Sequence, residues 1–170
     1  MTTCLIESPL GLVRITGNEE GVSVISCTDI QPGVNASETH QENQLPEPVR
    51  IAAQQLREYF TGMRRMFDFR MNPVGTTFQQ TVWRALLDVP FGTTLSYLAL
   101  TRRIGDEKAI RAVASANGRN PLWIVVPCHR IIGSDGSLTG YAGGLWRKKW
   151  LLEHERDLSG SETGRQLSLF

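Results

Sequence analysis

The sequence predicts an α+β protein in which short strands come first and helices follow. Three segments rich in β-branched and apolar residues precede any helical pattern: 4–7, 11–16 and 21–27. Beyond them, apolar residues recur mainly at helical spacing. A Pro- and Gly-containing stretch at 72–75 separates the two regions. We therefore expect a strand-rich support domain, a helical domain and a polar tail: 1–75, 76–158 and 159–170.

The first region contains a tight turn and one amphipathic helix. Ser8-Pro9-Leu10-Gly11 predicts a tight turn between the first two strands. A helix is expected over 48–61, after a polar surface loop at 28–48, and 67–71 is expected to form a returning strand. The apolar face of the helix is predicted from five positions: Val49, Ala52, Ala53, Leu56 and Phe60.

The second region begins with a helix and continues with a helix pair. Thr77 and Gln80 have the spacing of a capping box, and the helix they open places four residues inward: Phe78, Val82, Ala85 and Leu86. Two helical stretches follow at 95–103 and 107–117, with Gly105 as the turn and Asp106 as N-cap. This arrangement is typical of a helix-turn-helix, although such pairs also occur in purely structural settings.

Composition excludes several classes of protein. No apolar run approaches the roughly 20 residues of a membrane span, and the first residues lack the layout of a signal peptide. We therefore expect a cytoplasmic protein without a membrane partner. Residues 1–75 hold six basic and nine acidic side chains, whereas 76–155 hold ten basic and six acidic ones. The basic second half is compatible with a polyanionic partner or with an ordinary solvated surface.

The chemistry is expected at Cys128 and His129, where a strand running from residue 121 ends at Pro127. A thiolate is a strong nucleophile and histidine is a suitable base for producing it. Neighbours on an extended strand point to opposite sides, so the pair can cooperate only if the backbone turns at Pro127. A buried structural cysteine and a cysteine hydrolase remain alternatives. Zinc binding by Cys4, Cys27 and His40 is disfavoured, because their spacing fits no recurring ligand pattern.

The segment from Asn120-Pro121 through Val125-Val126-Pro127-Cys128-His129-Arg130-Ile131-Ile132-Gly133 resembles the active-site region of the O6-alkylguanine-DNA alkyltransferases. Other segments resemble the same family, in the same order: Ser8–Gly11, Phe78–Trp83, Arg111–Val113, Leu138–Gly144 and Leu151–Glu155. The resemblance implies a ribonuclease-H-like first domain and a winged helix-turn-helix-like second domain. It also implies repair of O6-alkylguanine, chiefly O6-methylguanine, by a single irreversible alkyl transfer.

The resemblance assigns chemical roles to individual residues. Cys128 is the alkyl acceptor, His129 takes its proton through a bound water, Glu155 orients His129, and Tyr97 protonates the departing guanine. The pocket is expected to contain four further residues: Ile131, Tyr141, Ala142 and Trp123. The carbonyls of Cys128 and Ile131 and the amide of Ala142 read the base edges. Neither a cofactor nor a metal is implied.

The resemblance also implies how duplex DNA binds. The second helix of the pair enters the minor groove, where small side chains permit close approach: Ala109, Ala112 and Ala114. Arg111 fills the stack left by the flipped base, although an ordinary arginine paired with Glu107 is the alternative. Asn120 acts as a hinge, and Arg130 is structural. The partner is double-stranded DNA containing O6-alkylguanine, bound by a protein that is monomeric without DNA.

Three residues depart from the family pattern. Glu107 replaces a common proline, and Ile110 replaces a small residue and either hinders groove binding or packs inward. Trp123 is bulkier than usual, and we expect it to narrow the pocket and favour methyl over benzyl lesions. A non-catalytic lesion-binding protein is the second hypothesis, but such relatives lack the cysteine that is present here. The last helix is expected over 145–155, and the tail from Ser159 is expected to lack fixed structure until Leu167-Ser-Leu-Phe170.

Overall fold

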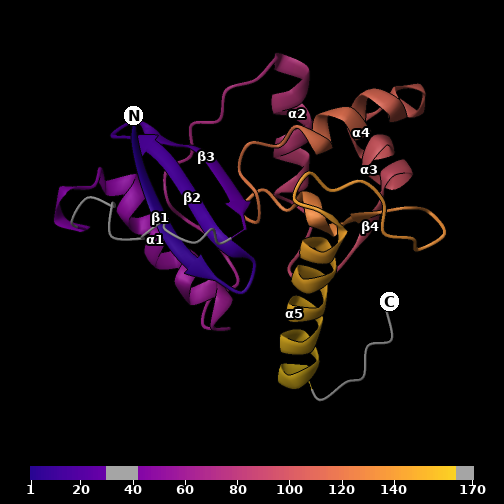
Figure 1. Ribbon diagram of the computed structural model, residues 1–170. Helices are drawn as coiled ribbons and strands as arrows, with labels where there is room; N and C mark the ends of the chain where they lie inside the picture. Colours follow the sequence, from indigo (N-terminus) through magenta and orange to yellow (C-terminus); the bar gives the residue numbers. More distant parts are fainter. Residues whose placement is uncertain (30–41, 164–170) are drawn as a thin grey trace. The chain divides into compact units, whose positions relative to one another are not determined.

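The computed structural model describes residues 1–29 and 42–163 (Figure 1). The chain forms two compact units, with the first comprising Met1–Val74 and Pro121–Trp123. The second comprises Gly75–Asn120 and the chain from Ile124 onward. The assignment of Pro121–Trp123 to the first unit was not expected, because these residues lie just before the active-site segment in the chain. No helix in the described ranges has the length and apolar character needed to cross a membrane.

An antiparallel three-stranded sheet forms the first unit, in the order β1 (Thr2–Ser8), β2 (Gly11–Asn18) and β3 (Gly21–Thr28). Ser8 pairs with Gly11 across the predicted turn, and Gly11 takes a positive φ of 100° that favours glycine. Side chains on one face of the sheet are buried, as alternation predicts. They include Cys4, Ile6, Val13, Ile15 and Ile25.

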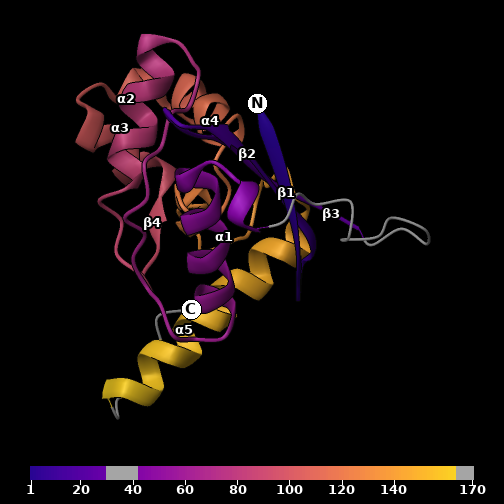
Figure 2. The same cartoon turned by 90° about the vertical axis from the view of Figure 1, so that its left-hand side faces the viewer.

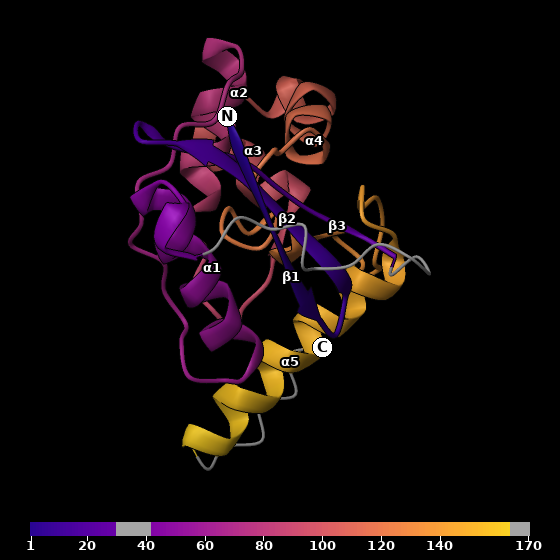
Figure 3. The ribbon, with the colours of Figure 1, turned by 60° about the vertical axis from the view of Figure 1, so that its left-hand side comes forward.

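The helix α1 (Glu47–Phe60) packs against all three strands, as Figure 3 shows, after a short 3-10 turn η2 (Glu42–Gln44). Most of the predicted apolar face is buried: Val49, Ala52, Ala53 and Leu56. Tyr59 is fully buried whereas Phe60 is only partly so, so the face ends one residue earlier than predicted. Gln55 is also buried, and it exchanges side-chain and backbone hydrogen bonds with Asp68.

Two strands expected from the sequence do not form. Residues 67–71 contribute only a bridge between Met71 and Val22, and the stretch from 121 contributes only a bridge between Leu122 and Ile25. Both bridges lie on β3, where Ile25 N–H donates to the Pro121 carbonyl at 2.8 Å. The apolar run before Cys128 is buried in turns, because a short apolar run cannot by itself distinguish a strand from other buried backbone.

The second unit is mainly helical. It begins with α2 (Thr77–Leu86) and continues through β4 (Leu95–Ser96), α3 (Tyr97–Ile104), the 3-10 turn η3 (Glu107–Ala109) and α4 (Ile110–Gly118). The 3-10 turn η4 (Cys128–Arg130), β5 (Ile131–Ile132) and α5 (Leu145–Thr163) complete it. β4 and β5 pair in parallel. Figure 2 shows α2, α3 and α4 gathered together, as their mutual contacts require.

The predicted helix pair is present as α3 and α4. Gly105 ends α3 in the left-handed conformation with φ 111°, and the Asp106 side chain accepts a hydrogen bond from Lys108 N–H at 3.0 Å. The last helix is longer than predicted, because α5 continues through 159–163. The expectation that the chain lacks fixed structure from Ser159 is therefore wrong for these five residues. The remaining tail, 164–170, lies outside the described residues, as does the middle of the predicted 28–48 loop.

The start of α2 differs by one residue from the prediction. Thr76, not Thr77, is the N-cap: its hydroxyl accepts from Gln79 N–H at 3.1 Å, and Gln79 Oε1 accepts from Thr76 N–H at 3.0 Å. Phe78, expected inside, is 38% exposed, whereas Trp83 is buried and donates to the Ala116 carbonyl at 2.9 Å. The buried residues of α2 are therefore Val82, Trp83 and Leu86, of which Val82 and Leu86 were expected inside.

Thr76→Ala is expected to lower the free energy of unfolding by about 1 kcal/mol, because it removes the capping hydroxyl. Thr77→Ala is the matched control and is expected to change it by less than about 0.5 kcal/mol. Urea denaturation followed by circular dichroism measures both. Equal effects of the two substitutions would contradict the assignment of the cap.

Candidate active site

The backbone turns at Pro127, as cooperation between Cys128 and His129 requires. Cys128 N–H donates to the Val126 carbonyl at 2.8 Å, and Arg130 N–H donates to the Pro127 carbonyl at 3.0 Å. The turn is preceded by Ile124 at φ 75°, an unusual conformation for a β-branched residue. The 3-10 geometry of η4 frees the two side chains from the opposite directions that a strand would impose.

His129 and Glu155 form a buried pair. Nε2 of His129 lies 2.7 Å from Oε2 of Glu155, and the two side chains are 0% and 1% exposed. An ionised carboxylate only accepts hydrogen bonds, so Nε2 carries the proton and Nδ1 has a free lone pair. Glu155 reaches this place because α5 extends past its first turns and aims the side chain at η4.

Arg130 holds the same carboxylate from the other side. Its Nε and Nη2 donate to Oε1 and Oε2 of Glu155 at 2.8 and 3.1 Å, and its Nη1 donates to the Val89 carbonyl at 2.7 Å. Gly92 N–H also donates to Oε1, at 3.3 Å. Burial by itself raises the pKa of Glu155, but the contacts with His129 and Arg130 outweigh it and hold the pKa well below its usual range. The carboxylate therefore stays charged.

Cys128 is 5% exposed and lies against Asn120. The amide Nδ2 of Asn120 donates to Cys128 Sγ at 3.2 Å and to the Val126 carbonyl at 2.7 Å. Burial raises the pKa of the Cys128 thiol to about 11, and the Asn120 hydrogen bond and the charge of Lys148 offset it only in part. At neutral pH the sulfur therefore carries its proton, and a base must take that proton for attack to occur.

His129 is suited to be that base. Burial lowers the pKa of its imidazole, although Glu155 opposes the shift, so the ring is neutral near pH 7. Among the described residues, Nδ1 of His129 is a buried polar atom without a hydrogen-bond partner. A neutral ring with Nε2 engaged by Glu155 presents Nδ1 as its proton acceptor.

Tyr97 opens α3, and its hydroxyl donates to the Thr139 carbonyl at 3.2 Å. Burial raises the pKa of Tyr97, the Thr139 contact lowers it, and the nearby Cys128 raises it again. The phenol thus keeps its proton and is electrostatically coupled to the sulfur. This is the protonation state that a proton donor requires.

Lys148 is a buried residue that the sequence analysis missed. Its ammonium donates to the carbonyls of Ile131 and Thr139 at 2.6 and 2.8 Å, and burial lowers its pKa to about 8. A signal was present in the sequence, because Lys148 precedes Leu151 and Leu152 by three and four residues and so shares their apolar face. The Ile131 carbonyl, expected to read the base edge, already accepts one hydrogen bond.

A largely apolar cleft of about 590 Å³ lies in the second unit. Five of its lining residues were expected at the site: Tyr97, Arg111, Ala114, Tyr141 and Ala142. Four were missed as lining residues: Ile110, Gly118, Thr139 and Gly140. Tyr97 belongs to this lining, whereas Cys128 is not among the described residues that line the cleft.

Other expected residues lie elsewhere. Ala109, Ala112, Ile131 and Trp123 are not among the described residues that line the cleft. The backbone N–H of Trp123 donates to the Ile25 carbonyl at 3.0 Å, within the first unit. The predicted effect of Trp123 on lesion size stays a prediction.

The helix pair departs from expectation at two positions. Ile110 is 36% exposed and lines the cleft, so the alternative in which it packs inward is wrong. Glu107 pairs with Arg102, at 2.6 Å between Oε1 and Nε, rather than with Arg111. Arg111 is exposed at the cleft, free of the predicted helical pair with Glu107.

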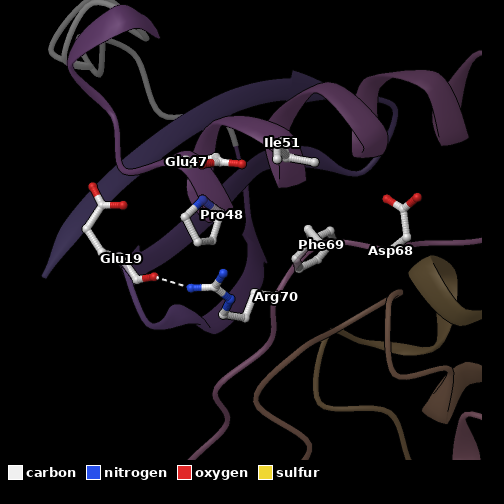
Figure 4. Close-up of a pocket in the computed structure, with 7 residues that line it drawn as sticks. All are labelled: Glu19, Glu47, Pro48, Ile51, Asp68, Phe69 and Arg70. Carbon is white, nitrogen blue, oxygen red and sulfur yellow. Dashed lines mark hydrogen bonds between the residues drawn. The ribbon is translucent and has the colours of Figure 1, made fainter.

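A second cavity, of about 270 Å³, lies in the first unit and is drawn in Figure 4. Its lining combines three carboxylates with an arginine and three apolar or ring side chains: Glu19, Glu47, Asp68, Arg70, Pro48, Ile51 and Phe69. Arg70 donates to the Glu19 carbonyl at 2.9 Å. The described ranges contain no cluster of three potential metal-binding side chains, and His40 lies outside them. No cysteine or histidine is among the described residues that line this cavity.

Both units match known sequence profiles. Residues 77–157 match the DNA binding domain of 6-O-methylguanine DNA methyltransferase, and residues 1–73 match its ribonuclease-like domain. The chain belongs to the 6-O-methylguanine DNA methyltransferase family. This confirms the family and the α+β fold expected from the sequence, with a ribonuclease-like first domain and a helical second domain.

Curated family members are similar over nearly their whole length. The methylated-DNA–protein-cysteine methyltransferase of Methanosarcina acetivorans is 43% identical over 155 residues, which are 91% of this chain and 98% of the relative. The Mycobacterium tuberculosis protein of the same name is 42% identical over 167 residues, covering 97% and 96%. A crystal structure of M. tuberculosis OGT in complex with DNA has a TM-score of 0.79 and 39% identity, covering 93% and 94%.

Glu155→Gln is expected to lower the free energy of unfolding at pH 7 by about 3 kcal/mol, because it leaves Arg130 buried without its counter-charge. The depressed pKa of Glu155 makes the advantage of the wild type complete above the ordinary value of 4.5 and smaller as the pH falls below it. Chemical denaturation of both proteins between pH 3 and pH 7 measures this difference.

Glu153→Gln is the matched control on the same helix. Glu153 is 46% exposed and lies 3.9 Å from Lys149, so its loss is expected to cost less than about 0.5 kcal/mol. A difference between wild type and Glu155→Gln that did not shrink in acid would contradict the assigned charge.

Proposed function

We propose that this protein repairs O6-alkylguanine in double-stranded DNA, chiefly O6-methylguanine, by moving the alkyl group irreversibly to its own Cys128. The observation that carries the proposal is the buried series Cys128, His129 and Glu155 in a member of this methyltransferase family. Relatives named methylated-DNA–protein-cysteine methyltransferase support the reaction, and the DNA complex of a similar structure supports the partner. We further propose that the protein is a monomer in the absence of DNA.

The transfer is a single displacement. As Sγ of Cys128 attacks the alkyl carbon, the thiol proton passes through one water to Nδ1 of His129, and the bond between that carbon and O6 breaks. The departing guanine takes a proton from the Tyr97 hydroxyl. His129 gains one proton and Tyr97 loses one, so the number of protons on the protein and the guanine together is unchanged. In the net reaction the alkyl group moves from guanine to Sγ of Cys128, and one hydrogen moves from the thiol to guanine.

The electrostatics favour this order of events. A thiol with a raised pKa gives little free thiolate, so proton removal and attack are coupled. The charged Glu155 stabilises the imidazolium that forms, in the way a carboxylate supports histidine in a hydrolase triad. A thioether is a poor leaving group, so nothing regenerates Cys128 and each molecule acts once.

Duplex DNA must present the lesion outside the stack, because a buried sulfur cannot reach a paired base. We propose that α4 binds the minor groove and that Arg111, exposed at the cleft, enters the stack in place of the flipped guanine. Small residues on this segment would allow close approach: Ala109, Ala112 and Ala114. Tyr141 and Ala142 would enclose the base, and Asn120 would link the helix pair to Cys128.

Mass spectrometry after mixing with a duplex that contains one O6-methylguanine tests the reaction. One added methyl group is expected on the peptide that contains Cys128 and on neither of the buried strand cysteines, Cys4 and Cys27. Cys128→Ser is expected to bind the duplex without gaining mass. Binding by the wild type without a mass change would instead identify a lesion-binding protein.

Arg111→Ala is expected to slow alkyl transfer from duplex DNA by about tenfold or more, because base flipping loses the side chain that replaces the base. Transfer from free O6-benzylguanine, which needs no flipping, is expected to change by less than about twofold in rate. Arg84→Ala, at an exposed position on α2, is the matched control. Equal slowing on both substrates would show that Arg111 acts on the chemical step instead.

A further inference from the structure

A buried polar side chain beside the cleft has no role in the mechanism described so far. Asn117 is the penultimate residue of α4 and is 2% exposed. It lies one helical turn after Ala114 and directly before Gly118, and both of these residues line the cleft together with Tyr97. Because α3 packs against α4, the side chain of Asn117 meets that of Tyr97, the first residue of α3.

Stability does not account for an amide at this position. Within the part of the chain that the structure describes, Oδ1 of Asn117 is a buried polar atom without a hydrogen-bond partner. An unpaired buried oxygen costs free energy, whereas an apolar side chain of similar size would leave no polar group unpaired. A buried polar group of this kind is therefore a candidate for a role in function.

The contact between Asn117 and Tyr97 favours the charged form of the phenol. Burial raises the pKa of Tyr97, the Thr139 side chain lowers it, Cys128 raises it, and the Asn117 side chain lowers it. A hydrogen bond lowers the pKa of an acid when it is donated to the deprotonated form, so the amide nitrogen of Asn117 faces the phenol oxygen. Thr139 is exposed, so water can replace its hydroxyl, but the buried Asn117 amide has no such substitute.

The transfer reaction produces this charged form. In the free protein the Tyr97 hydroxyl donates to the Thr139 carbonyl at 3.2 Å, and a carbonyl can only accept. Once the Tyr97 proton has moved to the departing guanine, the carbonyl repels the phenolate, which then needs a donor. We propose that Asn117 is a positioning residue whose amide N–H donates to the Tyr97 phenolate as the guanine leaves. The proposal rests on the proposed function, because it concerns the proton that Tyr97 gives up, and Asn117 keeps both of its own amide hydrogens.

Other charged or titratable groups also face Tyr97. Nζ of Lys148 lies 5.9 Å from the centre of the Tyr97 ring, Arg111 lines the same cleft, and Cys128 raises the Tyr97 pKa. The Lys148 ammonium already donates to two carbonyls, those of Ile131 and Thr139. All of these groups are retained when Asn117 alone is replaced, so a comparison with the wild type isolates the contribution of the amide.

The ionisation of Tyr97 in the free protein tests the contact itself. Labelling with 3-fluorotyrosine, whose phenol is more acidic than that of tyrosine, allows fluorine-19 spectra to follow the titration, and the signal missing from Tyr97→Phe identifies Tyr97. Asn117→Leu is expected to raise the pKa of Tyr97 without lowering the melting temperature, because it removes the donor and the unpaired oxygen together. Ser115→Ala, at an exposed position on the same helix, is the matched control and is expected to leave this pKa unchanged.

Single-turnover transfer from a duplex that contains one O6-methylguanine tests the consequence for the reaction. At saturating duplex, Asn117→Leu is expected to slow transfer by about fivefold or more, with little change in the duplex concentration that gives half of the maximal rate. In the Tyr97→Phe background the same substitution is expected to change the rate by less than about twofold, because no phenolate forms.

An unchanged pKa of Tyr97 in Asn117→Leu would overturn the proposal, and so would equal slowing with and without the Tyr97 hydroxyl. If Asn117→Leu lowers the melting temperature, Asn117→Ala removes the amide without overfilling the site, and the same two expectations apply to it. Failure of the wild type to gain a methyl group on Cys128 would refute the proposed function, whereas the titration of Tyr97 judges the Asn117 contact separately.

Discussion

The buried carboxylate of Glu155 is the interaction on which the rest of the site depends. It accepts hydrogen bonds from His129, Arg130 and Gly92, and so joins α5 to the turn that contains Cys128. Burying a charge costs free energy unless its oxygens accept hydrogen bonds. The Glu155 carboxylate accepts them from the side chains of His129 and Arg130 and from the backbone N–H of Gly92. These hydrogen bonds stabilise the 3-10 turn η4, although the apolar run 124–126 before it favours a strand.

Burial has opposite useful effects on Cys128 and His129. Burial keeps the Cys128 sulfur protonated, which protects it from side reactions, while the same burial keeps His129 neutral and able to accept a proton. Charge separation then arises only when substrate is present. Lys148 adds a buried cation close to the developing charges and ties together two carbonyls of the pocket wall.

Much of the fold could be predicted from local sequence patterns, because strand alternation, a glycine turn and an N-cap depend on neighbouring residues. The sheet, α1 and the pair α3–α4 are of this kind. Features that depend on contacts between distant parts of the chain could not be predicted from the sequence. The apolar stretch before Cys128 forms buried turns in place of the expected strand. Two local features also differ from the prediction, because neighbouring residues offered equivalent partners: Thr76 rather than Thr77 caps α2, and Glu107 pairs with Arg102. The cysteine and histidine could be found by their chemistry and by resemblance, whereas the role of Lys148 emerged only from its burial.

Glu155 holds His129 as a neutral ring with its proton on Nε2 and its lone pair on Nδ1. Nitrogen-15 correlation spectra of the histidine rings at neutral pH measure this directly. We expect Nε2 of His129 to show the chemical shift of a protonated nitrogen and Nδ1 that of an unprotonated one. A proton on Nδ1, or a doubly protonated ring, would contradict it, since neither form can accept the thiol proton at Nδ1.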